Sequence, residues 1–186
     1  MQEALQLEDP RLVMFAAISL LRQNVQIHPD VFVRVARSPE TRAVLYGLLE
    51  AADHKSRFPA QYLNQAALAE SDMVNWLIYP TELGRAPDEI DLVEVVRDLD
   101  GGDNGRDEMY LFRFRTIPPH WAAENGWMVG WSGPYRHDAA PTTTSPGGTF
   151  SEFAEWASAT REEHIGKIRE MFCDWRDPPA NEECES

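Results

Sequence analysis

The sequence predicts an α+β fold, in which an N-terminal layer of about four helices packs on a small antiparallel sheet and a C-terminal helix follows. Apolar residues recur at helical spacing over residues 1–80, the spacing changes to two from Ile90, and a last helical pattern starts near Thr160. We expect a helical subdomain over residues 1–80 and a sheet with a long loop and a final helix over residues 81–186, joined in one compact unit. With 186 residues, 43% of them hydrophobic, the chain can bury a core of this size.

Proline marks the start of three of the four predicted N-terminal helices. A helix over about residues 10–24 is apolar around most of its circumference, which predicts that it is buried. Pro29 opens a short second helix, because proline is favoured in the first helical turn. Ser38, followed by proline and an acid, predicts a side-chain cap for a third helix that ends near residue 53. A fourth helix spans residues 64–79, and the next proline ends it.

The centre of the chain predicts three strands with short connections. Residues 91–97 form the first strand, and the glycine-rich segment 100–108, with its Asn-Gly pair, forms the turn. Residues 110–115 alternate strictly between aromatic and other side chains, which is typical of a strand with one buried face. Residues 127–131 are the third strand, and residues 134–148 are a long loop without periodicity. This order predicts an antiparallel meander with one face on the helices.

The C-terminal part predicts one helix after an aromatic segment. Phe150, Phe153 and Trp156 fit one turn of helix or an aromatic latch, and they would also suit a homodimer contact. Thr160 and Glu163 form a capping box for the final helix. That helix holds one apolar side, made of Ile165, Ile168 and Phe172.

A pattern over about residues 38–164 is carried by five segments: MVNWLIYPTELGRAPDEIDL (73–92), LFRFR (111–115), PHWA (119–122), GWM (126–128) and GP (133–134). This pattern resembles a group of bacterial HEAT-repeat-like proteins. The resemblance implies a HEAT-like helical layer and a binding scaffold, and it implies no particular activity. A solenoid of such repeats needs about three copies of roughly 40–47 residues, so the four helices before the strands do not predict a complete one.

The charge of the chain favours a basic partner. The formal net charge is −14, which argues against a surface that binds nucleic acid or anionic membranes. Acids are in large excess over residues 70–108 and 152–186, on either side of an aromatic, slightly basic middle. Such a field speeds the encounter with a basic protein. The same charge could instead serve solubility alone.

Our leading functional hypothesis is a cytoplasmic protein-interaction module, such as an immunity-type protein that neutralises a basic toxin. Its acidic face would occupy the basic cleft of the partner and block it. The expected contact residues lie in the turn after the fourth helix, in the first strand and in the aromatic middle: Asp88, Glu89, Asp91, Glu94 and Trp121.

The alternative hypothesis is a small enzyme or a domain that binds an anionic ligand. Arginine recognises anions through paired hydrogen bonds. A pocket between the sheet and the long loop would gather the following residues: Glu82, Arg113, Arg115, His120 and His137. The two hypotheses differ in shape, because the alternative needs a concave pocket and the first needs an acidic face beside exposed aromatic residues.

The sequence gives no motif for a cofactor, a metal or a nucleophile, so we expect none of them. The five histidines are scattered without ligand spacing, although His120, His137 and a carboxylate could hold zinc if the fold brought them together. The acidic segment that starts at Asp98 lacks the glutamate of a calcium loop at its twelfth position. Ser132 lacks the second glycine of a nucleophile elbow, and Cys173 lies among acids that disfavour a thiolate.

The expected location is the cytoplasm. No apolar run approaches the roughly 18–20 residues of a membrane helix, and the acidic first ten residues lack the basic region of a secretory signal. Two cysteines near the C-terminal end imply no disulfide framework.

Overall fold

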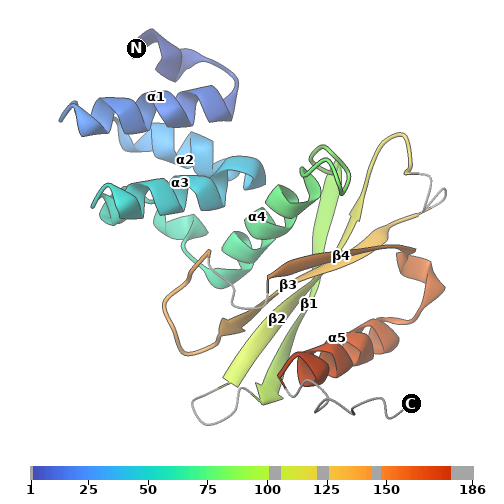
Figure 1. Cartoon of the computed structure of the whole chain (residues 1–186). Coiled ribbons are helices and arrows are strands. Elements are labelled where there is room, and N and C mark those ends of the chain that lie inside the picture. The colour runs from blue at the N-terminus through green and yellow to red at the C-terminus, as the bar shows by residue number, and fades with distance from the viewer. Residues whose placement is uncertain (1, 101–105, 121–125, 144–147, 177–186) are drawn as a thin grey trace, which may run out of the picture.

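The computed structural model describes residues 2–100, 106–120, 126–143 and 148–176. In this part of the chain, five α-helices accompany one antiparallel sheet with the strand order β1-β2-β3-β4, which confirms the predicted α+β fold. Figure 1 shows three helices stacked at one end, and a fourth that leads from them onto the sheet. None of the described helices has the length and apolar character that crossing a membrane requires.

The helical layer consists of α1 (Pro10–Arg22), α2 (Pro29–Arg37) and α3 (Pro39–Ala51), each with proline at its start as predicted. Ser38 lies at the N-cap position of α3, but its side chain makes no capping hydrogen bond, so that part of the prediction is wrong. Because α2 and α3 are separated by this single residue, Ser38 also ends α2, and its backbone N–H donates to the carbonyl of Val35.

Helix α1 is less buried than its composition predicts. Seven of its residues are buried, whereas Leu12 and Phe15 are 52% and 56% exposed. The reason is its place in the stack, because α1 lies at the outer end of the layer, where only the short 3-10 helix Gln2–Gln6 packs on it besides the helices of the layer (Figure 1). A helix that is apolar on every side therefore has one apolar stripe left in contact with solvent.

Helix α4 (Gln65–Leu77) belongs to two hydrophobic cores. Its Leu68 packs in the core of the helical layer, together with α1, α2 and α3. One residue later, Ala69 begins a second contact row, which continues with Met73 and Leu77 and packs on Phe112 and Phe114 of the sheet. The helical layer and the sheet therefore share this helix.

The strands are β1 (Glu89–Asp100), β2 (Arg106–Arg115), β3 (Met128–Arg136) and β4 (Thr149–Glu155). Strand β4 lies where the sequence left open one turn of helix or an aromatic latch, and the helical alternative is wrong. The spacing of three between its aromatic residues fits a helix, but pairing with β3 imposes the strand, with Phe150 opposite Trp131. Strand β3 also runs to Arg136, so the loop that we expected from residue 134 is shorter.

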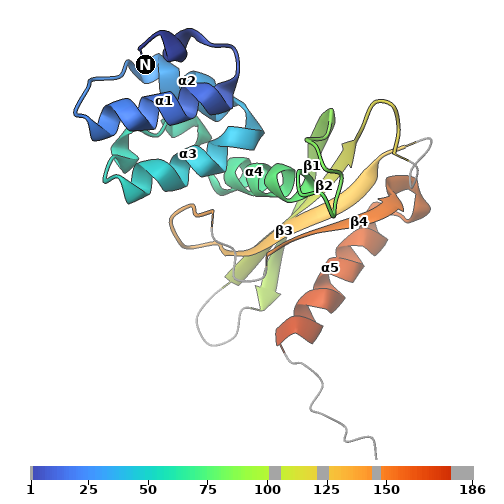
Figure 2. The ribbon, with the colours of Figure 1, turned by 45° about the horizontal axis from the view of Figure 1, so that its top comes forward.

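The second face of the sheet is covered by α5 (Arg161–Arg176). Its Ile168 and Phe172 pack on Leu111 and Val129, whereas the neighbouring Phe112 faces α4. Figure 2 shows α4 and α5 on opposite sides of the sheet. The predicted capping box is confirmed, because the backbone N–H groups of Thr160 and Glu163 each donate to the side chain of the other residue at 2.7 and 3.2 Å.

Candidate functional site: a groove along α4

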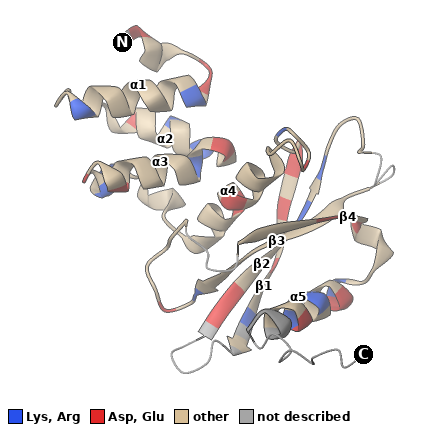
Figure 3. Cartoon of the chain, viewed as in Figure 1, with Lys and Arg blue, Asp and Glu red and all other residues tan. Residues whose placement is uncertain are grey.

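The acids of our leading hypothesis and the arginines of the alternative turn out to be partners of each other. Strands β1 and β2 place Asp91 opposite Arg113 and Glu89 opposite Arg115. Two nitrogens of Arg113 donate to one oxygen of Asp91 at 3.0 and 2.8 Å, and Arg115 donates to Glu89 at 2.6 Å. Figure 3 shows these acidic and basic positions side by side on the two strands. Their charges therefore cancel locally.

The other expected contact residues do not form a free acidic face either. Asp88 pairs with Arg85 at 3.1 Å and accepts a hydrogen bond from the backbone N–H of Ile117, and this bond is the main cause that lowers its pKa. Glu94 pairs with Arg161 of α5. Trp121 lies outside the described residues.

The two arginines are also held by an aromatic ring. The guanidinium groups of Arg113 and Arg115 lie over the ring of Trp127, at 4.5 and 4.8 Å from its centre. Because every second residue of a strand points to the same face, these arginines share the α5 face of the sheet with Leu111. The cluster ties β1, β2 and the start of β3 together.

The predicted pocket of arginines and histidines is not assembled. Glu82 lies on the α4 face, where it accepts from the hydroxyl of Ser151, so the sheet separates it from the arginines. His137 contacts the carboxylate of Glu108 at 3.0 Å, and His120 is half-buried beyond the end of β2. Among the described residues, no three histidine, cysteine or acidic side chains could hold a metal ion.

The aromatic residues of the homodimer alternative are engaged within the chain. Phe150 packs on Trp131 with 6.4 Å between ring centres, although 40% of it stays exposed. Trp156 stacks on the buried ring of His164 at 4.6 Å. The side chain of Phe153 lies outside the described part of the structure.

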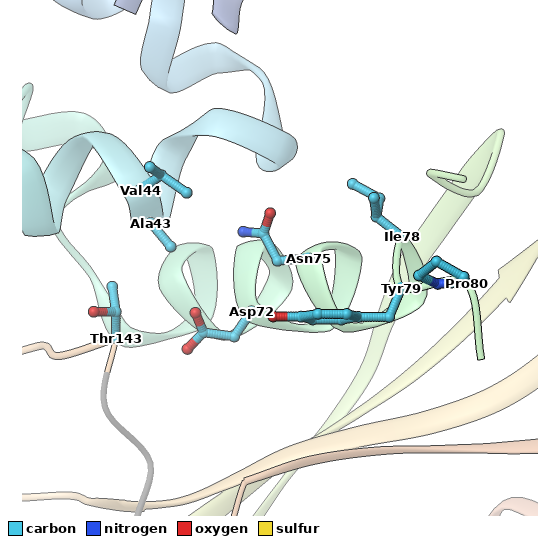
Figure 4. A pocket seen from close by; sticks show the side chains of 8 residues that line it. All are labelled: Ala43, Val44, Asp72, Asn75, Ile78, Tyr79, Pro80 and Thr143. Atoms are coloured by element: carbon cyan, nitrogen blue, oxygen red, sulfur yellow. The ribbon is translucent and has the colours of Figure 1, made fainter. Parts of the chain in front are cut away.

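A groove of about 560 Å³ runs along α4 and opens between α3, the loop after β3 and the end of α4. A smaller hollow of about 360 Å³ continues it toward the start of β4. Four residues line both hollows, so we treat the two as one groove: Asp72, Asn75, Tyr79 and Thr143. Figure 4 shows Asp72 and Asn75 on α4, with the ring of Tyr79 pointing back along the helix toward Asp72. The volume is in the range of ligand sites.

The loop that forms one wall of the groove is fixed to the helices. Gln65 of α4 donates to the carbonyl of Thr142 at 2.8 Å and accepts from its N–H at 3.0 Å. The hydroxyl of Tyr46 of α3 donates to the carbonyl of Pro141 at 3.0 Å. These bonds hold Thr143 beside Asp72, so contacts within the chain fix this wall of the groove.

Asp72 is the carboxyl group at the centre of this groove. Burial raises its pKa to about 7, against the smaller opposite effect of the hydrogen bond that Tyr135 donates to it at 2.8 Å. Within the described part of the chain, it has no arginine, lysine or histidine as an ion-pair partner. The groove therefore contains a carboxyl group whose charge is not compensated.

Glu108 shows how the same fold treats a carboxylate that is buried, whereas Asp72 is half-buried. Only 6% of this residue is exposed, and it receives a hydrogen bond from Tyr110. Arg97 and His137 contact it at 3.5 and 3.0 Å, so it has the basic neighbours that Asp72 lacks. Burying a charge is costly unless a partner compensates it. At Asp72, that partner can come from outside the chain through the groove.

A chain of hydroxyl groups runs below the groove from Asp72. The hydroxyl of Ser132 lies 2.7 Å from that of Tyr135 and 3.0 Å from that of Thr149, which lines the smaller hollow. Burial is the main cause that raises the pKa of Tyr135, so this phenol stays protonated. Ser132 is fully buried and is not accessible as a nucleophile. The arrangement suits binding better than covalent chemistry.

Asp72, Asn75 and Thr149 were not predicted as site residues, and Tyr135 was expected only as one of the aromatic residues in the middle of the chain. These residues come from α4, β3 and β4, and only the tertiary fold brings them together. One signal was present, because Asp72 lies four residues after Leu68 and four before Trp76, on the apolar stripe of the predicted helix. A carboxylate in such a stripe is either neutral or paired.

Comparison with protein-family models, curated proteins and solved structures finds no significant match. The resemblance to bacterial HEAT-repeat-like proteins therefore stays a prediction.

Proposed function

We propose that this protein is a binding module of the cytoplasm for a basic protein partner, and that the groove along α4 receives a basic side chain of that partner. The observation that carries the proposal is the uncompensated carboxyl group of Asp72 in the groove. An ammonium group placed there would give Asp72 the kind of neighbour that Arg97 gives Glu108.

The walls of the groove suit the rest of a lysine side chain. Four of the lining residues are apolar and could pack against its methylene groups: Ala43, Val44, Ile78 and Pro80. The ring of Tyr79 is 61% exposed and offers an aromatic face to a cation. Lysine carries both parts, a long apolar stem and a charged end.

The charge of the whole chain supports the same class of partner. At −14, the protein attracts a basic surface over a distance before any contact forms. A basic toxin neutralised by an immunity-type protein is one partner with this chemistry. In this proposal, the acids of β1 contribute to the long-range field, and Asp72 provides the specific contact.

The test measures binding of a short lysine peptide with blocked ends by calorimetry at pH 8. Asp72→Asn removes the charge in the groove, and Asp91→Asn removes one charge from the opposite face of the sheet as the matched control. We expect Asp72→Asn to weaken binding about tenfold or more, and Asp91→Asn to change it by less than about twofold.

Two results would overturn the proposal. The first is a wild-type protein that does not bind the peptide. The second is an equal loss in both variants, because net charge alone would then explain the binding. The same pair of variants applies unchanged once a partner protein is in hand.

A further inference from the structure

We infer that the hydroxyl chain Tyr135–Ser132–Thr149 makes Thr149 a hydrogen-bond acceptor whenever Asp72 is ionised, so that the groove selects a ligand with ammonium groups at both ends. The inference rests on the proposed function, because it assumes that the groove binds a basic group. It adds a second contact and a ligand class, which is two ammonium groups separated by an aliphatic chain.

The direction of each hydrogen bond follows from the number of protons available. An ionised carboxylate only accepts, so Tyr135 must donate its single proton to Asp72. Its oxygen is then an acceptor for Ser132, which has one proton as well and gives it to Tyr135. Thr149 must therefore donate to Ser132, and its remaining lone pairs are left for the groove.

Burial prevents water from changing the direction of these hydrogen bonds. Ser132 is 0% exposed and Tyr135 is 1% exposed, so water offers neither hydroxyl another partner. Asp72 and Thr149 both line the smaller hollow, and they lie at the two ends of the hydroxyl chain. Their separation is at most the length of three hydrogen bonds with two intervening oxygens, a span that an extended putrescine molecule can bridge.

Both ends of the smaller hollow therefore present hydrogen-bond acceptors. Ionised Asp72 accepts from one ammonium group, and Thr149 accepts from a second donor. A ligand with a carboxylate at the second end meets an oxygen that has no proton to give. Two lysine side chains of a protein partner and a free diamine both carry the required groups.

The first experiment compares three small probes of similar length at pH 8 by calorimetry: putrescine, n-butylamine and 4-aminobutyrate. We expect putrescine to bind about tenfold more tightly than n-butylamine, beyond the twofold expected for having two equivalent ends. We expect 4-aminobutyrate to bind more weakly than n-butylamine. A lysine peptide in the same assay, set against putrescine, distinguishes a protein source of the ammonium groups from a free diamine.

Variants of Thr149 and Ser132 test separately the acceptor at Thr149 and the order of protons along the hydroxyl chain. Thr149→Val removes the second acceptor and should reduce the preference for putrescine to about twofold, whereas Thr149→Ser should retain it. Ser132→Ala frees the proton of Thr149, so 4-aminobutyrate should gain affinity relative to n-butylamine in this variant alone. Because the three probes differ in charge, each probe is compared between wild type and a variant, and since these substitutions leave the net charge of −14 unchanged, its effect cancels.

The outcomes distinguish this inference from the proposed function. If no amine binds, the proposed function fails and the inference fails with it. If putrescine and n-butylamine bind within twofold of each other, the groove binds a single basic group and only the inference is overturned. Because net charge alone produces the same order of the three probes, the two Thr149 variants decide the inference: an undiminished preference for putrescine in Thr149→Val overturns it, and Thr149→Ser is the control for folding.

Discussion

Asp72 and Glu108 are two carboxyl groups that each accept a hydrogen bond from a buried tyrosine. Tyr135 donates to Asp72 and Tyr110 donates to Glu108, and the two rings meet edge to face at 5.8 Å. Their surroundings differ, since Glu108 is buried and has basic neighbours, whereas Asp72 is half-buried and has none within the described residues. Burial raises the pKa of Asp72, and no basic neighbour within the described residues opposes that effect.

This difference predicts how stability depends on pH. Asp72 ionises near 3.8 when unfolded and near 7 when folded, so the folded state binds more protons between these values. Wild-type stability at this site therefore falls as pH rises through that window. Asp72→Asn removes the titration and keeps an acceptor for Tyr135. We expect its free energy of unfolding, relative to wild type, to increase by about 2 kcal/mol between pH 5 and pH 8.

Chemical denaturation at the two pH values measures this difference directly. A difference between variant and wild type that is the same at pH 5 and pH 8 would mean that Asp72 stays ionised across the range. The source of the proposed function, an unfavourable charge in the groove, would then be absent.

Trp127 holds two arginines whose charges are already balanced by Glu89 and Asp91. Each cation–π contact at such a site contributes about 0.5–1 kcal/mol. We therefore expect Trp127→Leu to lower the free energy of unfolding by about 1–2 kcal/mol, measured in urea. Trp127→Phe keeps an aromatic face and should lose roughly half of that. Equal losses in the two variants would show that the aromatic face contributes nothing.

Local signals predicted most of the helices and strands. The prolines at residues 10, 29 and 39 and the Thr160 capping box gave correct helix starts, because these signals act within one turn. The alternation of residues 110–115 correctly predicted strand β2 and the burial of its aromatic face. Strand β4 was missed because its aromatic spacing fits either state and only its partner strand decides between them.

The candidate site could not be predicted in the same way. The arginines and acids of β1 and β2 were identified individually, but the register that pairs them is a property of the sheet. The groove depends on α3, α4 and β4 meeting at one place, which no local pattern contains. Asp72 was the one residue whose position in an apolar stripe could have been read from the sequence.

The close approach of α4 to the sheet depends on Gly130 in β3. A Cβ atom at this position would collide with the thioether of Met73 and lie 3.0 Å from the carbonyl oxygen of Phe150. We expect Gly130→Ala to lower the free energy of unfolding by about 1–3 kcal/mol in urea denaturation. The control is Gly47→Ala in α3, where nothing lies within 4 Å of an added Cβ.

The control should have the opposite sign. Alanine is favoured over glycine inside a helix by roughly 0.5–1 kcal/mol, so Gly47→Ala should stabilise the protein. In a Met73→Ala background, the loss caused by Gly130→Ala should become smaller, because part of the collision is removed. An unchanged loss in that background would show that α4 does not set the requirement for glycine.

At the level of the whole molecule, the acidic charge and the groove act at different distances. The net charge of −14 acts before contact and is screened by salt over about 10 Å at 0.1 M. Asp72 acts only within the groove, where screening is weaker. The two effects should therefore separate in the kinetics of binding.

We expect the association rate of a lysine peptide to fall at least several-fold between low salt and 0.5 M salt, with a much smaller change in its dissociation rate. Asp72→Asn should show the reverse pattern, with faster dissociation and nearly unchanged association. Stopped-flow measurements resolve both rates. An association rate that does not respond to salt would rule out steering by the acidic surface.

Helix α4 makes three kinds of contact, since it contributes to the core of the helical layer, packs on the sheet and lines the groove. Eight of its thirteen positions meet at least one of the three. Selection should therefore remove most substitutions in this segment, and sequence divergence should accumulate instead on the exposed stripe of α1. The rate of evolutionary change is expected to vary more between these two helices than between the helical layer and the sheet.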